Sequence, residues 1–173
     1  RSSDLRDICM VLFLLNTGLR IGELIELQMD DITLTKRKGS VLVRNGKGNK
    51  QRLVPLNQNA RRAMETWMEI HKEFETPYVW ISLENDNHLP LGTRSIQNIV
   101  RRIGKEADLP SLTPHTLRHT FAKNLADSSQ GIEKISLLLG HADLNTTKRY
   151  ILPNASDLEK TVTAIETDLD HIL

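Results

Sequence analysis

The residues best suited to chemistry lie in the last third of the chain, where His115, Arg118, His141 and Tyr150 follow one another. Such side chains can hold a phosphodiester and attack its phosphorus with a phenol oxygen. A phenol, with a pKa of about 10, is a better leaving group than an alkoxide. A phosphotyrosine link therefore keeps the energy of the diester for resealing, and the set points to reversible cleavage of nucleic acid.

Thr113 and Pro114 predict a helix start, because threonine is a good N-cap and proline suits the first helical position. His115 and Arg118, three residues apart, would share one face of the first turn. Backbone N–H groups and the helix dipole favour an anion there, and a guanidinium group adds bidentate recognition of phosphate oxygens. Taken singly, either residue is ordinary on a protein surface, so only the set indicates a phosphate site.

Two further cations precede this region. Arg20 follows a glycine that ends one helix, and it begins the next with Glu23 three residues on, where a plain ion pair is the simplest interpretation. Lys47 lies between Gly46 and Gly48 in a turn that can approach a ligand closely. A lysine on such a tip is usually just solvated, but here it could also reach into a DNA groove and protonate a departing oxygen.

The elements that must position these residues are mostly helices. Apolar spacing and capping residues predict helices over 4–16, 20–28, 59–74, 93–107, 114–126, 132–139, 145–152 and 157–170. Strands are expected over 40–44 and 51–55 around a glycine-rich turn, with a third at 78–82. The expected fold is mainly α with a small three-stranded antiparallel sheet at one edge, and residues 1–173 form a single domain.

Composition and charge narrow the class of protein. The 173 residues contain no apolar run of the roughly 20 residues that a membrane helix needs, and no signal peptide, so a cytoplasmic location is expected. Cys9, within an apolar stretch, is expected to be an inert core thiol. Net charge is only +1, but residues 32–64 contain no acidic side chain, whereas the tail from residue 151 is acidic. This asymmetry indicates a basic face for a polyanion, or else a solvated basic hairpin.

Five segments, in order, resemble the catalytic domain of the tyrosine recombinases, the phage-type integrase family. They are TGLRIGEL at 17–24, GKGNKQRLVPL at 46–56, TPHTLRHTFA at 113–122, LLGH at 138–141, and Tyr150. The resemblance extends over nearly the whole chain. Such proteins carry an N-terminal core-binding DNA domain. We expect that this domain is absent from the 173 residues and that, given the start at Arg1, a segment precedes them in the full protein.

The resemblance implies a role for each matching residue. Tyr150 would form a 3′-phosphotyrosine link with DNA, and Lys47 would act as general acid for the departing 5′-oxygen. The remaining implied catalytic residues are Arg20, Arg118, His115 and His141, with Glu23 and His119 in supporting roles and Arg44, Lys50 and Arg52 on the DNA backbone. No metal, nucleotide or other cofactor is implied.

The resemblance also implies partners. The substrate would be double-stranded DNA, and a C-terminal helix over about 155–173, with an apolar seam, would pack on a neighbouring protomer in a synaptic tetramer. Packing on its own domain is the alternative for that helix. A bacterial or phage-encoded recombinase would use this activity to integrate or excise a mobile element.

Three alternatives remain at the level of sequence. A type IB topoisomerase would cut and reseal DNA by the same route without exchanging partners. A non-catalytic module could use 114–126 and 132–139 as a helix-turn-helix, which leaves Arg20, Lys47 and Tyr150 unexplained. A metal hydrolase could use His115 and His119, four apart, but no third ligand is evident.

Overall fold

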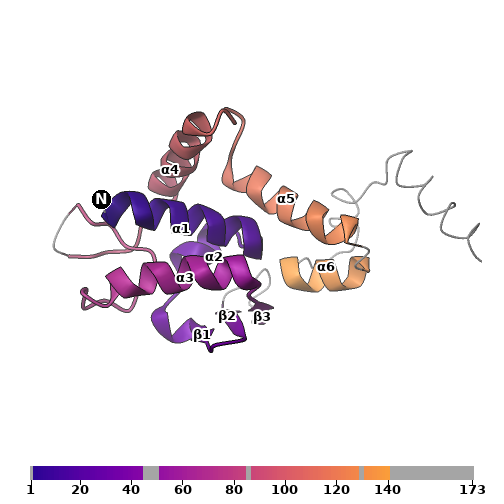
Figure 1. Ribbon diagram of the computed structural model, residues 1–173, viewed down its shortest axis with the longest axis horizontal. Helices are drawn as coiled ribbons and strands as arrows, with labels where there is room; N and C mark the ends of the chain where they lie inside the picture. The colour runs from indigo at the N-terminus through magenta and orange to yellow at the C-terminus, as the bar shows by residue number, and fades with distance from the viewer. Residues whose placement is uncertain (1, 45–50, 85–86, 129–130, 141–173) are drawn as a thin grey trace, which may run out of the picture.

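The computed structural model describes residues 2–44, 51–84, 87–128 and 131–140 (Figure 1). Helices dominate, and a small sheet lies at one edge of the molecule, as predicted. The elements in chain order are α1 (Ser2–Thr17), α2 (Ile21–Ile25), the 3-10 turn η1 (Met29–Asp31), β1 (Ile32–Leu34), β2 (Gly39–Val43), β3 (Arg52–Pro55), α3 (Gln58–His71), α4 (Thr93–Glu106), α5 (Pro114–Asp127) and α6 (Ile132–Leu139).

The sheet has three antiparallel strands in the order β1-β2-β3, with Val41 of β2 opposite both Ile32 and Val54. The prediction of its third strand was wrong. Residues 78–82 are not a strand of this sheet, since Tyr78 and Ile81 each form only an isolated bridge. The third strand is β1, which is three residues long and therefore carries almost no period-two signal.

Residues 79–81 are buried completely or almost completely, which explains why they resemble a strand in the sequence. Their backbone groups form single hydrogen bonds with residues that are not in the sheet. The amide of Val79 donates to the carbonyl of Leu27 at 3.0 Å, and the amide of Leu91 donates to the carbonyl of Trp80 at 2.9 Å. An apolar, extended segment can thus enter a core without joining a sheet.

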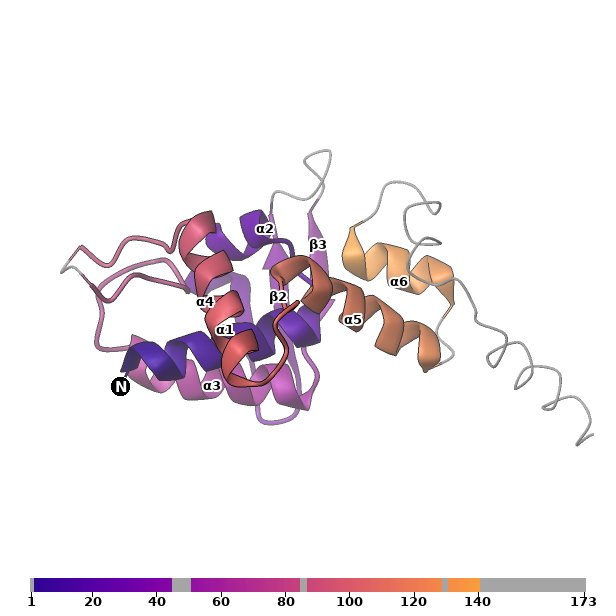
Figure 2. The same ribbon diagram turned by 90° about the horizontal axis from the view of Figure 1, so that it is seen from above.

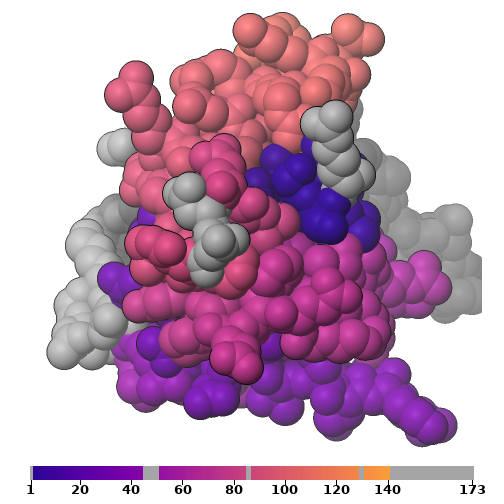
Figure 3. All heavy atoms as spheres, turned by 90° about the vertical axis from the view of Figure 1, so that its left-hand side faces the viewer, coloured from indigo at the N-terminus to yellow at the C-terminus, as the bar shows by residue number. Residues whose placement is uncertain are grey.

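The main core lies between α1, α3 and the segment that follows α3. Phe13 of α1 contacts Trp80, and Trp80 stacks on Trp67 of α3 with ring centroids 6.1 Å apart. The indole of Trp67 donates to the carbonyl of Val79 at 2.7 Å. Cys9 is buried in the same core, as predicted, and burial raises the pKa of its thiol. In Figure 3 the magenta residues of α3 and the following segment lie directly against the indigo start of α1.

A second, smaller cluster joins α5 to α6. Ala122 of α5 packs with Ile135 and Leu139 of α6, and all three are buried. Figures 1 and 2 both show α5 and α6 side by side at one end of the molecule, away from α4. This packing places the C-terminal end of α6 next to the end of α1 and to β3, where the candidate site lies.

None of the helices in the described part of the chain has the length and apolar character needed to span a membrane.

Candidate active site

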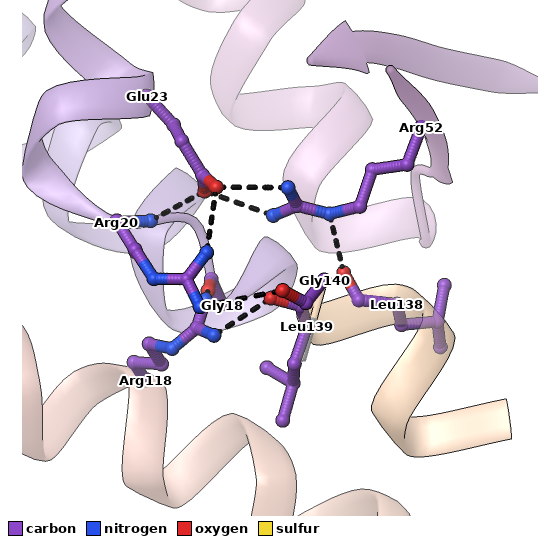
Figure 4. A network of polar contacts seen from close by, with 8 residues as sticks. All are labelled: Gly18, Arg20, Glu23, Arg52, Arg118, Leu138, Leu139 and Gly140. Atoms are coloured by element: carbon purple, nitrogen blue, oxygen red, sulfur yellow. Dashed lines mark hydrogen bonds and ion pairs between the residues drawn. The ribbon is translucent and has the colours of Figure 1, made fainter. Parts of the chain in front are cut away.

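Glu23 lies at the centre of a buried polar network (Figure 4). Its carboxylate accepts hydrogen bonds from the backbone amide and Nη1 of Arg20, both at 2.9 Å. The two residues are close because Arg20 is the N-cap of α2 and Glu23 lies in the first turn of that helix. Arg52 of β3 approaches from the other side and donates through Nη1 and Nη2, both at 2.8 Å. Burial alone would raise the pKa of Glu23, but the hydrogen bonds and charges of Arg52 and Arg20 outweigh it, and the pKa lies below its ordinary value of 4.5.

The C-terminal end of α6 binds three arginines from three different elements. The last carbonyl groups of a helix lack intrahelical partners and carry negative partial charge, so guanidinium groups complement them. Three successive carbonyls each accept one such bond: Leu138 from Arg52 Nε at 2.9 Å, Leu139 from Arg118 Nη2 at 2.7 Å, and Gly140 from Arg20 Nη2 at 3.5 Å. The arginine network, defined as Arg20, Arg52, Arg118 and Glu23, therefore surrounds the residues that lead into His141.

Arg118 is buried and connects two parts of the chain that are far apart in sequence. Besides Leu139, its guanidinium group donates through Nη1 to the carbonyl of Gly18 at the end of α1. The helix that carries it begins as predicted, because the hydroxyl of Thr113 accepts from the amide of Thr116 at 3.1 Å. Arg20 and Arg118 thus bind adjacent carbonyl groups, and the structure brings these two predicted phosphate ligands together.

The two histidines of α5 lie on its surface. His115, in the first turn, and His119, one residue beyond Arg118, are both exposed. Over the described ranges, no group of three or more His, Cys, Asp or Glu side chains is placed to hold a metal ion. The other predicted residues of the site, Lys47, Lys50, His141 and Tyr150, lie outside the described residues, as do the predicted helices at 145–152 and 157–170.

The two described arginines expected on the DNA backbone have different environments. Arg44 follows β2, its side chain is 48% exposed, and its Nε donates to the carboxylate of buried Asp31 at 2.5 Å. The side chain of Arg52 is only 11% exposed and is directed into the arginine network. Its pairing with Glu23 was missed by sequence reasoning, since 29 residues separate the two and no local spacing connects them.

Glycine at position 18 is required by both conformation and packing. Its φ is +63°, and a Cβ there would lie 2.3 Å from Cδ1 of Phe121 on α5. We expect Gly18→Ala to lower the free energy of unfolding by at least about 2 kcal/mol, measured by urea denaturation. Gly22 is the matched control: a Cβ there meets nothing within 4 Å. Gly22→Ala should leave the protein unchanged or about 0.5–1 kcal/mol more stable, and equal losses in both variants would contradict the packing described.

Comparison with known proteins agrees with this architecture. The sequence profile of the phage integrase family matches residues 1–156. The tyrosine recombinase XerA of Pyrococcus furiosus is 34% identical over 158 residues, which cover 91% of this chain and 54% of that protein. The crystal structure of XerA recombinase superposes with a TM-score of 0.81 at 31% identity, covering 94% of this chain and 57% of that one.

A structure of the site-specific recombinase XerH bound to a palindromic difH substrate, a post-cleavage complex, has a TM-score of 0.79. It is 26% identical and covers 94% of this chain and 46% of its own. The fold described above is therefore that of a tyrosine recombinase catalytic domain. The chain belongs to the phage integrase family, the tyrosine recombinases, as its sequence motifs indicated. It spans about half the length of the curated relatives it matches.

Proposed function

We propose that this protein is a site-specific DNA recombinase that cleaves and rejoins DNA strands through a 3′-phosphotyrosine intermediate. The observation that carries the proposal is the convergence of Arg20 and Arg118 on adjacent carbonyls at the end of α6, directly before His141. Two guanidinium groups held this way can bind the two non-bridging oxygens of one phosphate. Membership of the family and the DNA complex of XerH support the same substrate class.

In the proposed reaction the phenol oxygen of Tyr150 attacks phosphorus and gives its proton to His115. The bond between phosphorus and the 5′-oxygen breaks, and Lys47 supplies the proton that turns this oxygen into a hydroxyl. Arg20, Arg118 and His141 stabilise the charge that grows on the equatorial oxygens of the transition state. Attack by another 5′-hydroxyl reverses these steps and restores the diester, so bond energy is conserved throughout.

A nicked suicide substrate tests this proposal, because the short 5′-fragment diffuses away after cleavage and traps the intermediate. We expect a covalent protein–DNA adduct that forms equally well in the presence of EDTA. Absence of an adduct, or strand hydrolysis that requires a divalent metal, would contradict it. A second reaction with two distinguishable DNAs separates recombination, which joins them, from the topoisomerase alternative, which only relaxes DNA.

Arg118 should contribute strongly to this reaction. Arg118→Ala removes a preorganised cation at the phosphate, so adduct formation should slow by about 10²–10³-fold. The matched control is Arg101→Ala, because Arg101 is exposed on α4 and donates a 3.0 Å hydrogen bond to Asn98. The single-turnover cleavage rate of each variant is measured at saturating protein. Similar rates for the Arg118 and Arg101 variants would refute the role of Arg118.

We also propose that double-stranded DNA and further copies of this chain are its partners. The segment 155–173, outside the described residues, would pack on a neighbouring protomer in a synaptic tetramer. Its acidic composition makes direct contact with DNA unfavourable. Removing the residues after Asn154 should therefore abolish tetramers on DNA in sedimentation experiments while a single protomer still binds, and intact tetramers would rule this assembly out. We further propose that the protein is bacterial or phage-encoded and acts in the cytoplasm on chromosomal or element DNA, to integrate or excise a mobile element.

A further inference from the structure

Arg52 is the member of the arginine network for which the proposed reaction has no use. All three nitrogens of its guanidinium group donate inside the protein: Nη1 and Nη2 to the carboxylate of Glu23 at 2.8 Å, and Nε to the carbonyl of Leu138 at 2.9 Å. Its side chain is 11% exposed. These contacts make a direct bond from Arg52 to a DNA phosphate unfavourable, since it would break a buried, bidentate ion pair.

The contacts of Arg52 affect the net charge around Arg20. Glu23 is shared between Arg20 and Arg52, so two cations face one carboxylate. Without Arg52, Glu23 would pair with Arg20 alone and would neutralise it. With Arg52 in place, the three residues together keep one positive charge. The side chain of Arg20 is 34% exposed, so this charge is accessible to an anion at the surface.

The position of the α6 end also depends on Arg52. Its bond to Leu138 holds the last turn of α6 against β3, and Gly140, two residues on, accepts from Arg20. A Cβ on Gly140 would lie 2.8 Å from Nη1 of Arg52, so the guanidinium group packs directly on this glycine. Arg52 therefore contacts both neighbours of Arg20 in the network, the carboxylate and the helix end.

We propose that Arg52 is a positioning residue for phosphate binding, which offsets the charge of Glu23 and fixes the end of α6 so that Arg20 presents a full positive charge to the scissile phosphate. This inference rests on the proposed recombinase function. It replaces the DNA-backbone contact expected for Arg52 from the sequence.

The test compares Arg52→Ala with Arg44→Ala. Arg44 lies in the same hairpin, its side chain is 48% exposed, and it is expected on the DNA backbone, so its loss should weaken DNA binding and make the salt dependence shallower. For Arg52→Ala we expect DNA affinity lowered by no more than about tenfold, the loss expected at a single phosphate, and cleavage of the bound suicide substrate slowed by about 10–100-fold. Loss of an outer partner that orients a metal ligand has effects of this size. If Arg52→Ala instead weakens DNA binding with a shallower salt dependence, as a lost phosphate contact does, while bound DNA is cleaved at the wild-type rate, the proposal is overturned.

A neutral methylphosphonate at the scissile position separates this role from a merely structural one. It removes the charge that Arg20 balances, so the defect of Arg52→Ala should shrink to less than about threefold. An equal defect on both substrates would mean a general disturbance of the fold and would overturn the proposal.

Two further variants keep the test decisive if Arg52→Ala is unstable. The double variant Arg52→Ala with Glu23→Gln removes the carboxylate charge that Arg52 offsets, and it should cleave at least about fivefold faster than Arg52→Ala alone. Arg52→Lys keeps the charge without the bidentate geometry and should give an intermediate rate. No recovery in the double variant would overturn the role in charge balance.

Binding of inorganic phosphate, followed by NMR of the arginine side chains, tests the inference without any catalysis. Arg52→Ala should bind phosphate about tenfold more weakly than wild type, and unchanged affinity would overturn the inference. If the wild-type protein forms no covalent adduct but this difference is found, the proposed function fails while the role of Arg52 stands.

Discussion

Replacing Tyr150 with phenylalanine is expected to slow formation of the covalent protein–DNA adduct by at least about 10⁴-fold. The change removes a single oxygen atom, which is the proposed nucleophile, and leaves the arginines that hold the phosphate in place. DNA affinity should therefore remain within about twofold of wild type. Adduct yield on the suicide substrate and equilibrium binding to an uncut duplex measure the two effects.

The chain supplies a matched control, because its only other tyrosine is Tyr78. Tyr78 is half-buried beside the main core, and its backbone carbonyl accepts a hydrogen bond from Nε2 of His71 at 2.7 Å. Tyr78→Phe removes the same oxygen atom from the same residue type, and it should leave the adduct yield unchanged. A Tyr150→Phe variant that still forms the adduct would exclude the proposed nucleophile.

The largest expected effect on stability comes from Glu23→Ala. This variant removes the carboxylate that pairs with Arg52 and accepts from the N-terminus of α2, and the side chain of Arg52 is only 11% exposed. Breaking a buried ion pair from one side costs about 3–5 kcal/mol, because the remaining charge is no longer compensated. Urea unfolding at pH 7 should show a loss of this size. The exposed pair of Glu69 and Lys72, also three residues apart, is the control, and Glu69→Ala should cause no measurable change.

The same variant should also change how stability depends on pH. The pKa of Glu23 in the folded protein lies below 4.5, so the unfolded chain binds more protons as the pH falls below this value. The stabilisation from Glu23 is complete above about pH 4.5 and is lost as the pH falls through the folded-state pKa. The difference in stability between wild type and Glu23→Ala should therefore narrow from pH 7 to pH 3. A constant difference would show that the ion pair is not its source.

Much of the fold could be predicted because helices carry strong local signals. Helix α6 has the predicted bounds, and α4 and α5 differ from theirs by a single residue. All three helices have apolar residues at helical spacing, and α5 also starts at a recognisable cap, Thr113. The sheet was harder, because β1 is only three residues long, whereas the strand-like residues at 78–82 are extended for reasons of core packing.

The candidate site could be predicted as a set of residue types but not as a network. Arg20, Glu23 and Arg118 stand out by their positions at helix starts, and the structure does bring the two arginines together. Their fixed partners are the carbonyl groups of Gly18 and of the α6 end, and a carbonyl has no sequence signature. The inward direction of Arg52 likewise follows from tertiary packing and not from its place in a basic hairpin.

The central claim is that the phenol oxygen of Tyr150 displaces a 5′-oxygen from phosphorus and becomes joined to the 3′ end of the DNA. Digestion of the trapped adduct with nuclease and protease, followed by mass spectrometry, tests it most directly. We predict a nucleotide attached through its 3′-phosphate to the peptide that contains Tyr150, and a free 5′-hydroxyl on the released strand. A nucleotide on any other residue, or attachment through a 5′-phosphate, would contradict this account.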